Sequence, residues 1–147
     1  MEIISNSKIL PCISIVIPCY NERSTIRELL EAINAQTYPR EKLEIVVVDG
    51  LSTDGTRDVI QAFQQERGDL HIQLIDNPKR IIPEAMNAGI RAARGEVVVR
   101  LDAHCTVAKD YLELVAAKLE TTDAACLGPR MLMKPVDTPI ARAIAAA

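Results

Sequence analysis

The segment VVRLDAHC, residues 98–105, places two residue types that bind metals at the end of an apolar run. Asp102 and His104 are separated by a single residue. Carboxylate oxygens and imidazole nitrogens are both common ligands of divalent cations. The pair therefore favours a cation site, and the structural alternative is a neutral histidine in a polar turn.

Other residues with functional side chains follow three further apolar runs. They are Pro18, Tyr20 and Glu22 after the first run, Asp49 after the second, and Lys79 and Arg80 after the third. In an open α/β sheet, ligands bind outside the carboxyl ends of the strands, near the point where strand order reverses. We therefore expect these groups to meet at one edge of a sheet.

Four short apolar runs are expected to form the strands that position these side chains. They span residues 13–18, 43–50, 70–76 and 95–102, are rich in Ile and Val, and are bounded by Gly, Pro, Asn or Asp. This composition is typical of strands covered on both faces. Apolar residues at helical spacing follow each run, at 24–36, 57–66, 84–95 and 108–120. The alternation predicts an α/β fold, a mostly parallel sheet with helices on both faces.

Local signals suggest where some of these elements begin and end. Suitable capping residues precede the first two helices: Ser24 or Thr25 before the first, and Ser52, Thr53 and Asp54 before the second. Gly95 is a suitable residue to end the third helix, and residues 124–132 could form a further strand.

Composition excludes several classes of protein. The chain has 147 residues, a length suited to one domain, and a net charge of −3, so it has no excess of basic residues for binding nucleic acid. It lacks both a signal peptide and an apolar stretch of the roughly 20 residues that span a bilayer, so we expect a cytoplasmic location. Its four cysteines have no metal-site spacing and are expected to be reduced.

Four motifs in order resemble the family 2 glycosyltransferases of GT-A fold. They are PCYNE after the first strand, VVVDGLSTDGT after the second, a basic residue before AMNAGIRAARGE, and LDAH after the fourth. The resemblance covers residues 13–130 and is strongest to bacterial enzymes that build exopolysaccharides. It implies a Rossmann-like nucleotide-binding half and transfer of a sugar, with inversion, from a nucleotide diphosphate to a saccharide or lipid-linked acceptor. A UDP-sugar is the expected donor.

The resemblance also implies roles for individual residues at the nucleotide. Tyr20 would stack on the base, with Pro18 and Glu22 beside the base and ribose, and Asp49 would hydrogen-bond the base. The structural alternative is that Pro18 only ends the strand and Tyr20 covers the core. Gly50 stands where many family members have a second Asp, which leaves the base preference open.

A second group of residues would bind the diphosphate. Lys79 and Arg80 could reach the pyrophosphate, which Arg binds in a bidentate manner; a solvated pair is the alternative. Asp102 would bind ribose or metal, and His104 would replace the usual acidic metal ligand. Imidazole suits Mn²⁺ better than Mg²⁺, so Mn²⁺ is the expected cation. Asn87 and Gly89 match the family's helix pattern and are expected to pack.

The catalytic base of an inverting enzyme is missing from residues 105–147, where no matching acidic motif occurs. We therefore expect a single donor-binding domain over residues 1–147, incomplete at its C-terminus, with the base beyond Ala147. Apolar residues over 108–132 and 139–147 would lie uncovered and favour a homodimer. Contact with the inner face of a membrane would come only from further regions.

Two rival functions and one further expectation remain open. The rivals are a nucleotidyltransferase that makes sugar nucleotides and a non-catalytic module that binds them; PCYNE lacks the Gly-rich basic loop of the first. If the first and fourth strands are neighbours, Cys19 and Cys105 lie at the ligand edge and should react faster than Cys126. Four inert, buried thiols are the alternative.

Overall fold

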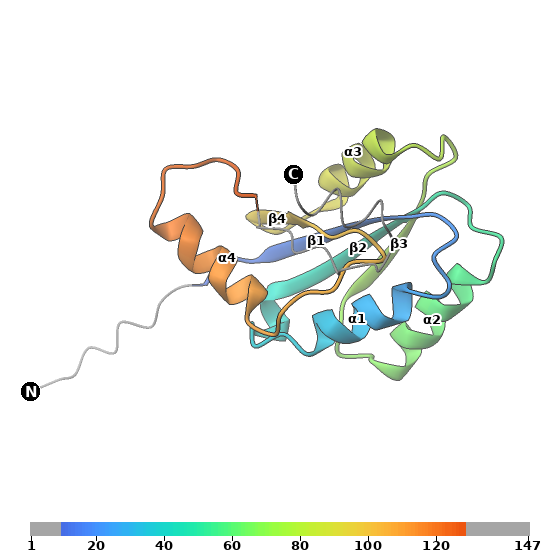
Figure 1. The fold of residues 1–147 in the computed structure, drawn as a ribbon, viewed down its shortest axis with the longest axis horizontal. Helices are drawn as coiled ribbons and strands as arrows, with labels where there is room; N and C mark the ends of the chain where they lie inside the picture. Colours follow the sequence, from blue (N-terminus) through green and yellow to red (C-terminus); the bar gives the residue numbers. More distant parts are fainter. Residues whose placement is uncertain (1–9, 129–147) are drawn as a thin grey trace, which may run out of the picture.

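The computed structural model describes residues 10–128 and shows alternating strands and helices (Figure 1). The strands are β1 (Ile13–Cys19), β2 (Leu43–Asp49), β3 (Ile72–Asp76) and β4 (Val97–Arg100). The helices are α1 (Ile26–Asn34), α2 (Thr56–Glu66), α3 (Ile82–Ala92) and α4 (Tyr111–Glu120), with a short 3₁₀ turn at Arg40–Lys42. The predicted β-α-β-α-β-α-β order is confirmed.

The four strands form one parallel sheet in the order β3-β2-β1-β4. In the register of the sheet, Cys19 pairs with Asp49 and Asp49 pairs with Asp76, so the carboxyl ends of β1, β2 and β3 lie side by side. The chain runs outward from β1 to β3 and then returns to place β4 on the other side of β1. The reversal of strand order therefore falls between β1 and β4, where ligands bind in such sheets.

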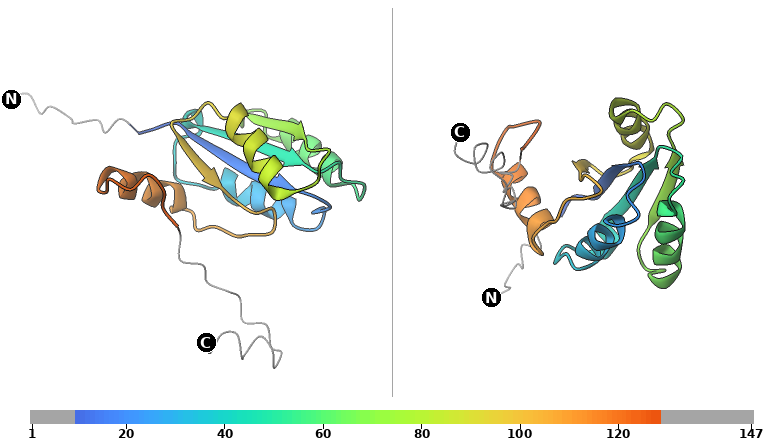
Figure 2. Two further views of the ribbon diagram at one scale, coloured as in Figure 1. Left: turned by 90° about the horizontal axis from the view of Figure 1, so that it is seen from above. Right: turned by 45° about the vertical axis from the view of Figure 1, so that its right-hand side comes forward.

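Helices cover both faces of the sheet, as predicted, but unequally. In β1, Ile13, Ile15 and Ile17 belong to the core cluster that also contains buried residues of α1, α2 and α4. Val16 points to the opposite face, where α3 packs. Figure 2 shows α3 alone above the sheet and α1 and α2 together below it. Alternation along a strand that is buried on both faces thus produces two cores of different size.

The third helix differs from its prediction at both ends. It begins at Ile82, with Pro83 in its first turn, where the missing N–H of proline costs nothing. It ends at Ala92, so the expectation that Gly95 ends it is wrong. Gly95 instead packs against β1: a Cβ at this position would lie 2.7 Å from the backbone nitrogen of Ser14. The glycine is required by this close approach rather than by a helix cap.

The strand expected over residues 124–132 is absent from the part of that segment that the structure describes. Residues 124–128 adopt no strand, and the rest of that segment lies outside the described residues. Within residues 10–128, none of the helices combines the length and the apolar character needed to cross a membrane.

Gly89 provides a test of the packing between α3 and the sheet. A Cβ on Gly89 would overlap the side chain of Val16, whereas a Cβ on Gly68 would meet no atom within 4 Å. We expect Gly89→Ala to lower the free energy of unfolding by about 1–2 kcal/mol, because overpacking outweighs the gain of ~1 kcal/mol in helix propensity. Urea denaturation would measure the change in the free energy of unfolding, with Gly68→Ala as the matched control. Equal stability of the two variants would contradict the packing role predicted for Gly89.

Candidate functional site

An open cleft lies beyond the carboxyl ends of β1 and β4, at the reversal of strand order. Six of the residues singled out from the sequence line it: Pro18, Tyr20, Glu22, Arg80, Asp102 and His104. Gly50, Asn77, Ile81, Ile82 and Arg100 are among the other lining residues. The six predicted residues come from the end of β1 and from the loops after β1, β3 and β4, which the parallel topology brings to one place.

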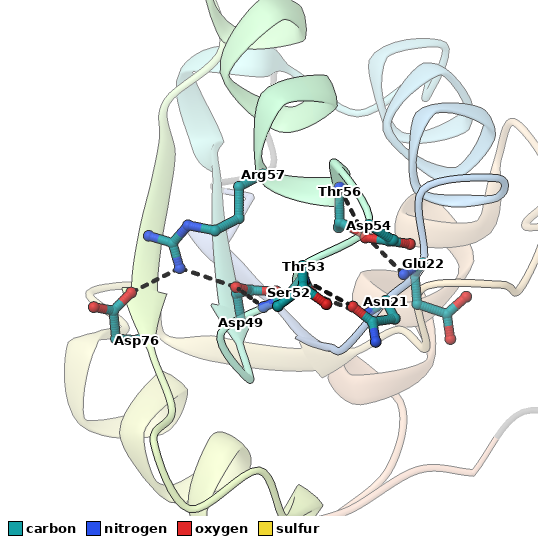
Figure 3. Close-up of polar contacts among 9 residues, drawn as sticks. All are labelled: Asn21, Glu22, Asp49, Ser52, Thr53, Asp54, Thr56, Arg57 and Asp76. Carbon is teal, nitrogen blue, oxygen red and sulfur yellow. Dashed lines mark hydrogen bonds and ion pairs between the residues drawn. The ribbon is translucent and has the colours of Figure 1, made fainter.

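Asp49 was predicted to contact the base but does not line the cleft. Its side chain has 0% exposure. Oδ1 accepts a hydrogen bond from the hydroxyl of Ser52, and Oδ2 accepts from the Ser52 backbone N–H at 3.0 Å and from Nη1 of Arg57 at 2.9 Å (Figure 3). The carboxylate is therefore committed to the loop that follows β2.

Arg57 neutralises this buried carboxylate from the first turn of α2. Its Nη1 also lies 2.8 Å from Oδ1 of Asp76, so one guanidinium joins the ends of β2 and β3. Hydrogen bonds to Asp76 and then Asp49 raise the pKa of Arg57 above its usual value. Arg57 is not among the residues singled out from the sequence. Its position two residues after Gly55, at the start of a helix beside an acidic strand end, is the signal that could have identified it.

The loops after β1 and β2 are joined by a series of short polar contacts (Figure 3). The backbone N–H of Asn21 donates to Ser52 Oγ at 2.8 Å, and the N–H of Thr53 donates to Asn21 Oδ1 at 2.9 Å. The N–H of Glu22 donates to Thr56 Oγ1 at 2.9 Å. Asn21 itself is in the left-handed region, with φ of 53°, which Asn tolerates better than most residues. These contacts fix the loop that carries Tyr20.

The capping prediction is correct in position for α1 but wrong for α2, and neither N-cap side chain accepts a hydrogen bond from its helix. Gly55, with φ of 95°, stands at the N-cap of α2, and Asp54 Oδ1 accepts from the backbone N–H of Thr56 at 3.0 Å. The Thr56 hydroxyl is the main cause of the lowered pKa of Asp54. Thr25 stands at the N-cap of α1, but its hydroxyl donates to Glu22 Oε2 at 2.7 Å instead of accepting from the helix.

Tyr20 and Arg80 lie next to each other in the wall of the cleft. The guanidinium carbon of Arg80 lies 5.5 Å from the centre of the Tyr20 ring, within the range of a cation–π contact. Arg80 has φ of 55°, and Asn77 stabilises its turn by accepting the Arg80 N–H at 3.0 Å. A Cβ on Gly50 would lie 3.0 Å from the Tyr20 ring. The absence of a side chain at position 50 thus allows the ring to lie where it does.

Lys79 is not part of the cleft wall. Its Nζ lies 2.7 Å from Oε1 of Glu84, in the first turn of α3. Of the two basic residues singled out after the third strand, Arg80 lines the cleft and Lys79 forms an exposed ion pair. Phosphate binding therefore remains the interpretation for Arg80, whereas the alternative of a solvated basic residue fits Lys79.

Asp102 and His104 lie on the same wall with different partners. Asp102 Oδ1 accepts from Nε of Arg100 at 2.9 Å, and Nδ1 of His104 lies 3.0 Å from Oε1 of Glu22. Among the described residues, no group of three or more His, Cys, Asp or Glu side chains is arranged to hold a metal. Asp102 and His104 could thus supply part of a coordination shell, and a ligand would have to supply the rest.

The strands β1 and β4 are neighbours, as expected, but only Cys19 of the two cysteines lines the cleft; Cys105 packs against the larger core. Cys19 is only 6% exposed, and burial followed by the charges of Asp49, Glu22 and Asp54 raises its pKa to about 12. Burial likewise raises the pKa of Cys105. Cys126 is exposed. We therefore expect Cys126 to react faster than Cys19, the opposite of the predicted order, since the thiolate is the reactive form.

The chain is similar to known proteins of one family over most of its length. The model of a family described as "Glycosyl transferase family 2" matches residues 14–145. The "Succinoglycan biosynthesis protein ExoA" of Rhizobium meliloti (strain 1021) is 38% identical over 112 residues, covering 75% of this chain and 33% of ExoA.

Two solved structures share the fold. One is the mannosyltransferase PcManGT from Pyrobaculum calidifontis in complex with GDP-Man and Mn²⁺, with a TM-score of 0.69, 38% identity, and coverage of 76% of this chain and 32% of that one. The other is S. aureus TarS 1–349 in complex with UDP, with a TM-score of 0.63, 28% identity, and coverage of 74% and 32%. The chain spans about a third of the length of these proteins.

Removing Arg57 should show how far the buried carboxylate depends on it. We expect Arg57→Ala to lower the free energy of unfolding by about 3 kcal/mol, since it leaves the charge of Asp49 buried and less compensated. Arg40→Ala removes an exposed pair with Asp69 and should cost less than about 1 kcal/mol. Chemical denaturation at neutral pH would compare them. Similar losses for both variants would show that Asp49 does not need Arg57.

Alkylation should distinguish the thiols in the order that the structure favours. At pH 8 we expect iodoacetamide to modify Cys126 at least ~10-fold faster than Cys19, because Cys19 is buried and its raised pKa leaves little thiolate. Mass spectrometry of peptides would follow each residue, with the urea-unfolded chain as the control in which the rates converge. Faster modification of Cys19 in the folded protein would restore the original expectation.

Proposed function

Since the chain belongs to the family 2 glycosyltransferases, we propose that it is the donor-binding part of an enzyme that passes a sugar from a nucleotide diphosphate to a saccharide or lipid-linked acceptor, with inversion. The observation that carries the proposal is the convergence of six residues, chosen from the sequence for this role, on one cleft. The family match also argues against the rival nucleotidyltransferase function.

The nucleotide would lie against the wall formed by Tyr20 and Arg80. The Tyr20 side chain is 44% exposed, so its ring offers a free face for a planar base, while Pro18 provides an apolar edge beside it. Arg80 is within reach of the same ring and carries the donors that bind phosphate oxygens. The cleft has a volume of about 190 Å³, which is below the ~300–1,000 Å³ of typical ligand pockets. A nucleotide sugar would therefore fill it and extend beyond it.

The residues at the end of β4 fit a divalent cation that is shared with the diphosphate. Asp102 would offer an oxygen and His104 a nitrogen, a mixed set that suits Mn²⁺ better than Mg²⁺. When bound, such a cation neutralises negative charge on the departing diphosphate. Arg100 and Arg80 would add positive charge to the same wall, which keeps the phosphates near the metal ligands.

Several parts of the proposal concern the whole protein. A role in the synthesis of polysaccharides or cell-envelope glycans is supported by the likeness to ExoA. The relatives carry UDP in one case and GDP-Man in the other, so the UDP-sugar donor is a prediction. The catalytic base, the cytoplasmic location and the homodimer are predictions as well; the dimer depends mainly on apolar residues outside 10–128.

Nucleotide titrations test the proposed function directly. By calorimetry, we expect UDP or GDP to bind at least ~10-fold more tightly with Mn²⁺ than with EDTA, because the cation joins the diphosphate to Asp102 and His104. Asp102→Asn should remove most of this metal effect. Tyr20→Ala should weaken binding about 10-fold with or without metal, through loss of stacking.

Neighbouring basic residues provide a matched control. Arg80→Ala should weaken nucleotide binding, whereas Lys79→Ala should not, because Lys79 is turned toward Glu84. A folded protein that binds neither nucleotide, with or without Mn²⁺, would overturn the proposed function. If Lys79→Ala and Arg80→Ala weaken nucleotide binding equally, Arg80 has no specific role in the nucleotide site.

A further inference from the structure

The His104 ring is held by a carboxylate that is distant in sequence. Glu22, in the loop after β1, places Oε1 at 3.0 Å from Nδ1 of His104, although 82 positions separate them in sequence. The His104 side chain is 64% exposed, and the Glu22 side chain is 25% exposed. Both residues line the cleft. The contact therefore lies at the edge of the proposed donor site and not in the core.

This contact determines which nitrogen of the ring can bind a cation. A carboxylate only accepts hydrogen bonds, so Nδ1 must carry the proton that lies between the two groups. The lone pair of a neutral ring then resides on Nε2, which forms no hydrogen bond with any residue that the structure describes. Carboxylates and carbonyls that fix metal-binding histidines in this way raise the basicity of the ligating nitrogen as well as orienting the ring.

We propose that Glu22 is a positioning residue for a metal ligand: it holds His104 in the tautomer that leaves Nε2 available to the divalent cation of the donor site. The inference rests on the proposed function and changes the role first expected for Glu22, which was contact with base and ribose.

Glu22 is itself well fixed before any ligand arrives. Its Oε2 accepts the hydroxyl proton of Thr25 at 2.7 Å, and its backbone N–H donates to Thr56 Oγ1 at 2.9 Å. With one carboxylate oxygen held by Thr25 and the other by His104, the side chain has a defined orientation. A simple surface ion pair would not need this support, and its effect on stability would be small at such exposure. Removal of the Glu22 carboxylate should therefore leave the fold largely intact.

The tautomer can be measured without metal or nucleotide. The chain has two histidines, so ¹⁵N spectra of the imidazole rings are readily assigned with a His71→Gln variant. At a pH where the ring is neutral, we expect His104 to carry its proton on Nδ1. Glu22→Ala should shift it toward the Nε2–H form, and Glu22→Gln, which keeps an acceptor, should retain much of the Nδ1–H form. An Nε2–H ring in the unaltered protein would overturn the proposal.

The affinity for Mn²⁺ tests whether the tautomer held by Glu22 matters for metal binding. In Mn²⁺ titrations followed by electron paramagnetic resonance, at saturating UDP or GDP, we expect Glu22→Ala to weaken Mn²⁺ binding ~10–100-fold, and Glu22→Gln to weaken it less. In a His104→Asp background, Glu22→Ala should change Mn²⁺ affinity by no more than about 2-fold, because the ring that Glu22 orients is gone. Circular dichroism would verify that each variant is folded.

The outcomes separate this inference from the proposed function. Tight Mn²⁺ binding that is unaffected by Glu22→Ala would overturn the positioning role and leave the donor site standing. Equal losses of metal-free nucleotide binding by Glu22→Ala in both backgrounds would return Glu22 to the ribose contact first expected. No Mn²⁺ binding by the unaltered protein with nucleotide would overturn both proposals.

Discussion

The buried carboxylate of Asp49 is the constraint on which the loops of the site depend. An ionised group without exposed surface is costly unless it is paired and hydrogen-bonded, and Asp49 obtains both from Ser52 and Arg57. The hydroxyl of Ser52 donates to Asp49 and at the same time accepts the backbone N–H of Asn21. The need to compensate one charge at the end of β2 therefore extends to the neighbouring loop, which carries Tyr20.

The strands, the helices and most of the cleft could be predicted from the sequence because their signals are local. The apolar stripe of α1 is buried as its spacing predicts, and the parallel topology then brings the strand ends together without knowledge of side-chain contacts. The misplaced details arise from tertiary contacts. Gly95 looks like the end of a helix, but it is required by the backbone of β1, which is distant in sequence. Cys19 lies at the predicted edge, but its burial, together with three nearby acids, raises the pKa of its thiol.

The partners of the site residues could not be predicted, because each depends on distances between separate elements. Glu22 and His104 carry no local sign of their contact, and neither Arg57 nor Asp49 shows from its neighbours that they share a hydrogen bond. The sequence identified which types of residue reach the cleft. It did not show that Asp49 would be buried behind the wall, or that Lys79 would pair with Glu84 outside the cleft.

The charge that the cleft offers to a cation depends on the pairing of His104 with Glu22. Many relatives are expected to have an acid where this chain has His104, and a neutral imidazole alone would offer one negative charge less to a cation. The carboxylate of Glu22, 3.0 Å from Nδ1, supplies that charge through the ring. The pair thus carries the net charge of a single carboxylate but presents nitrogen instead of oxygen. Because a neutral ring needs an acceptor at Nδ1 to hold this tautomer, a histidine at position 104 depends on the carboxylate at position 22.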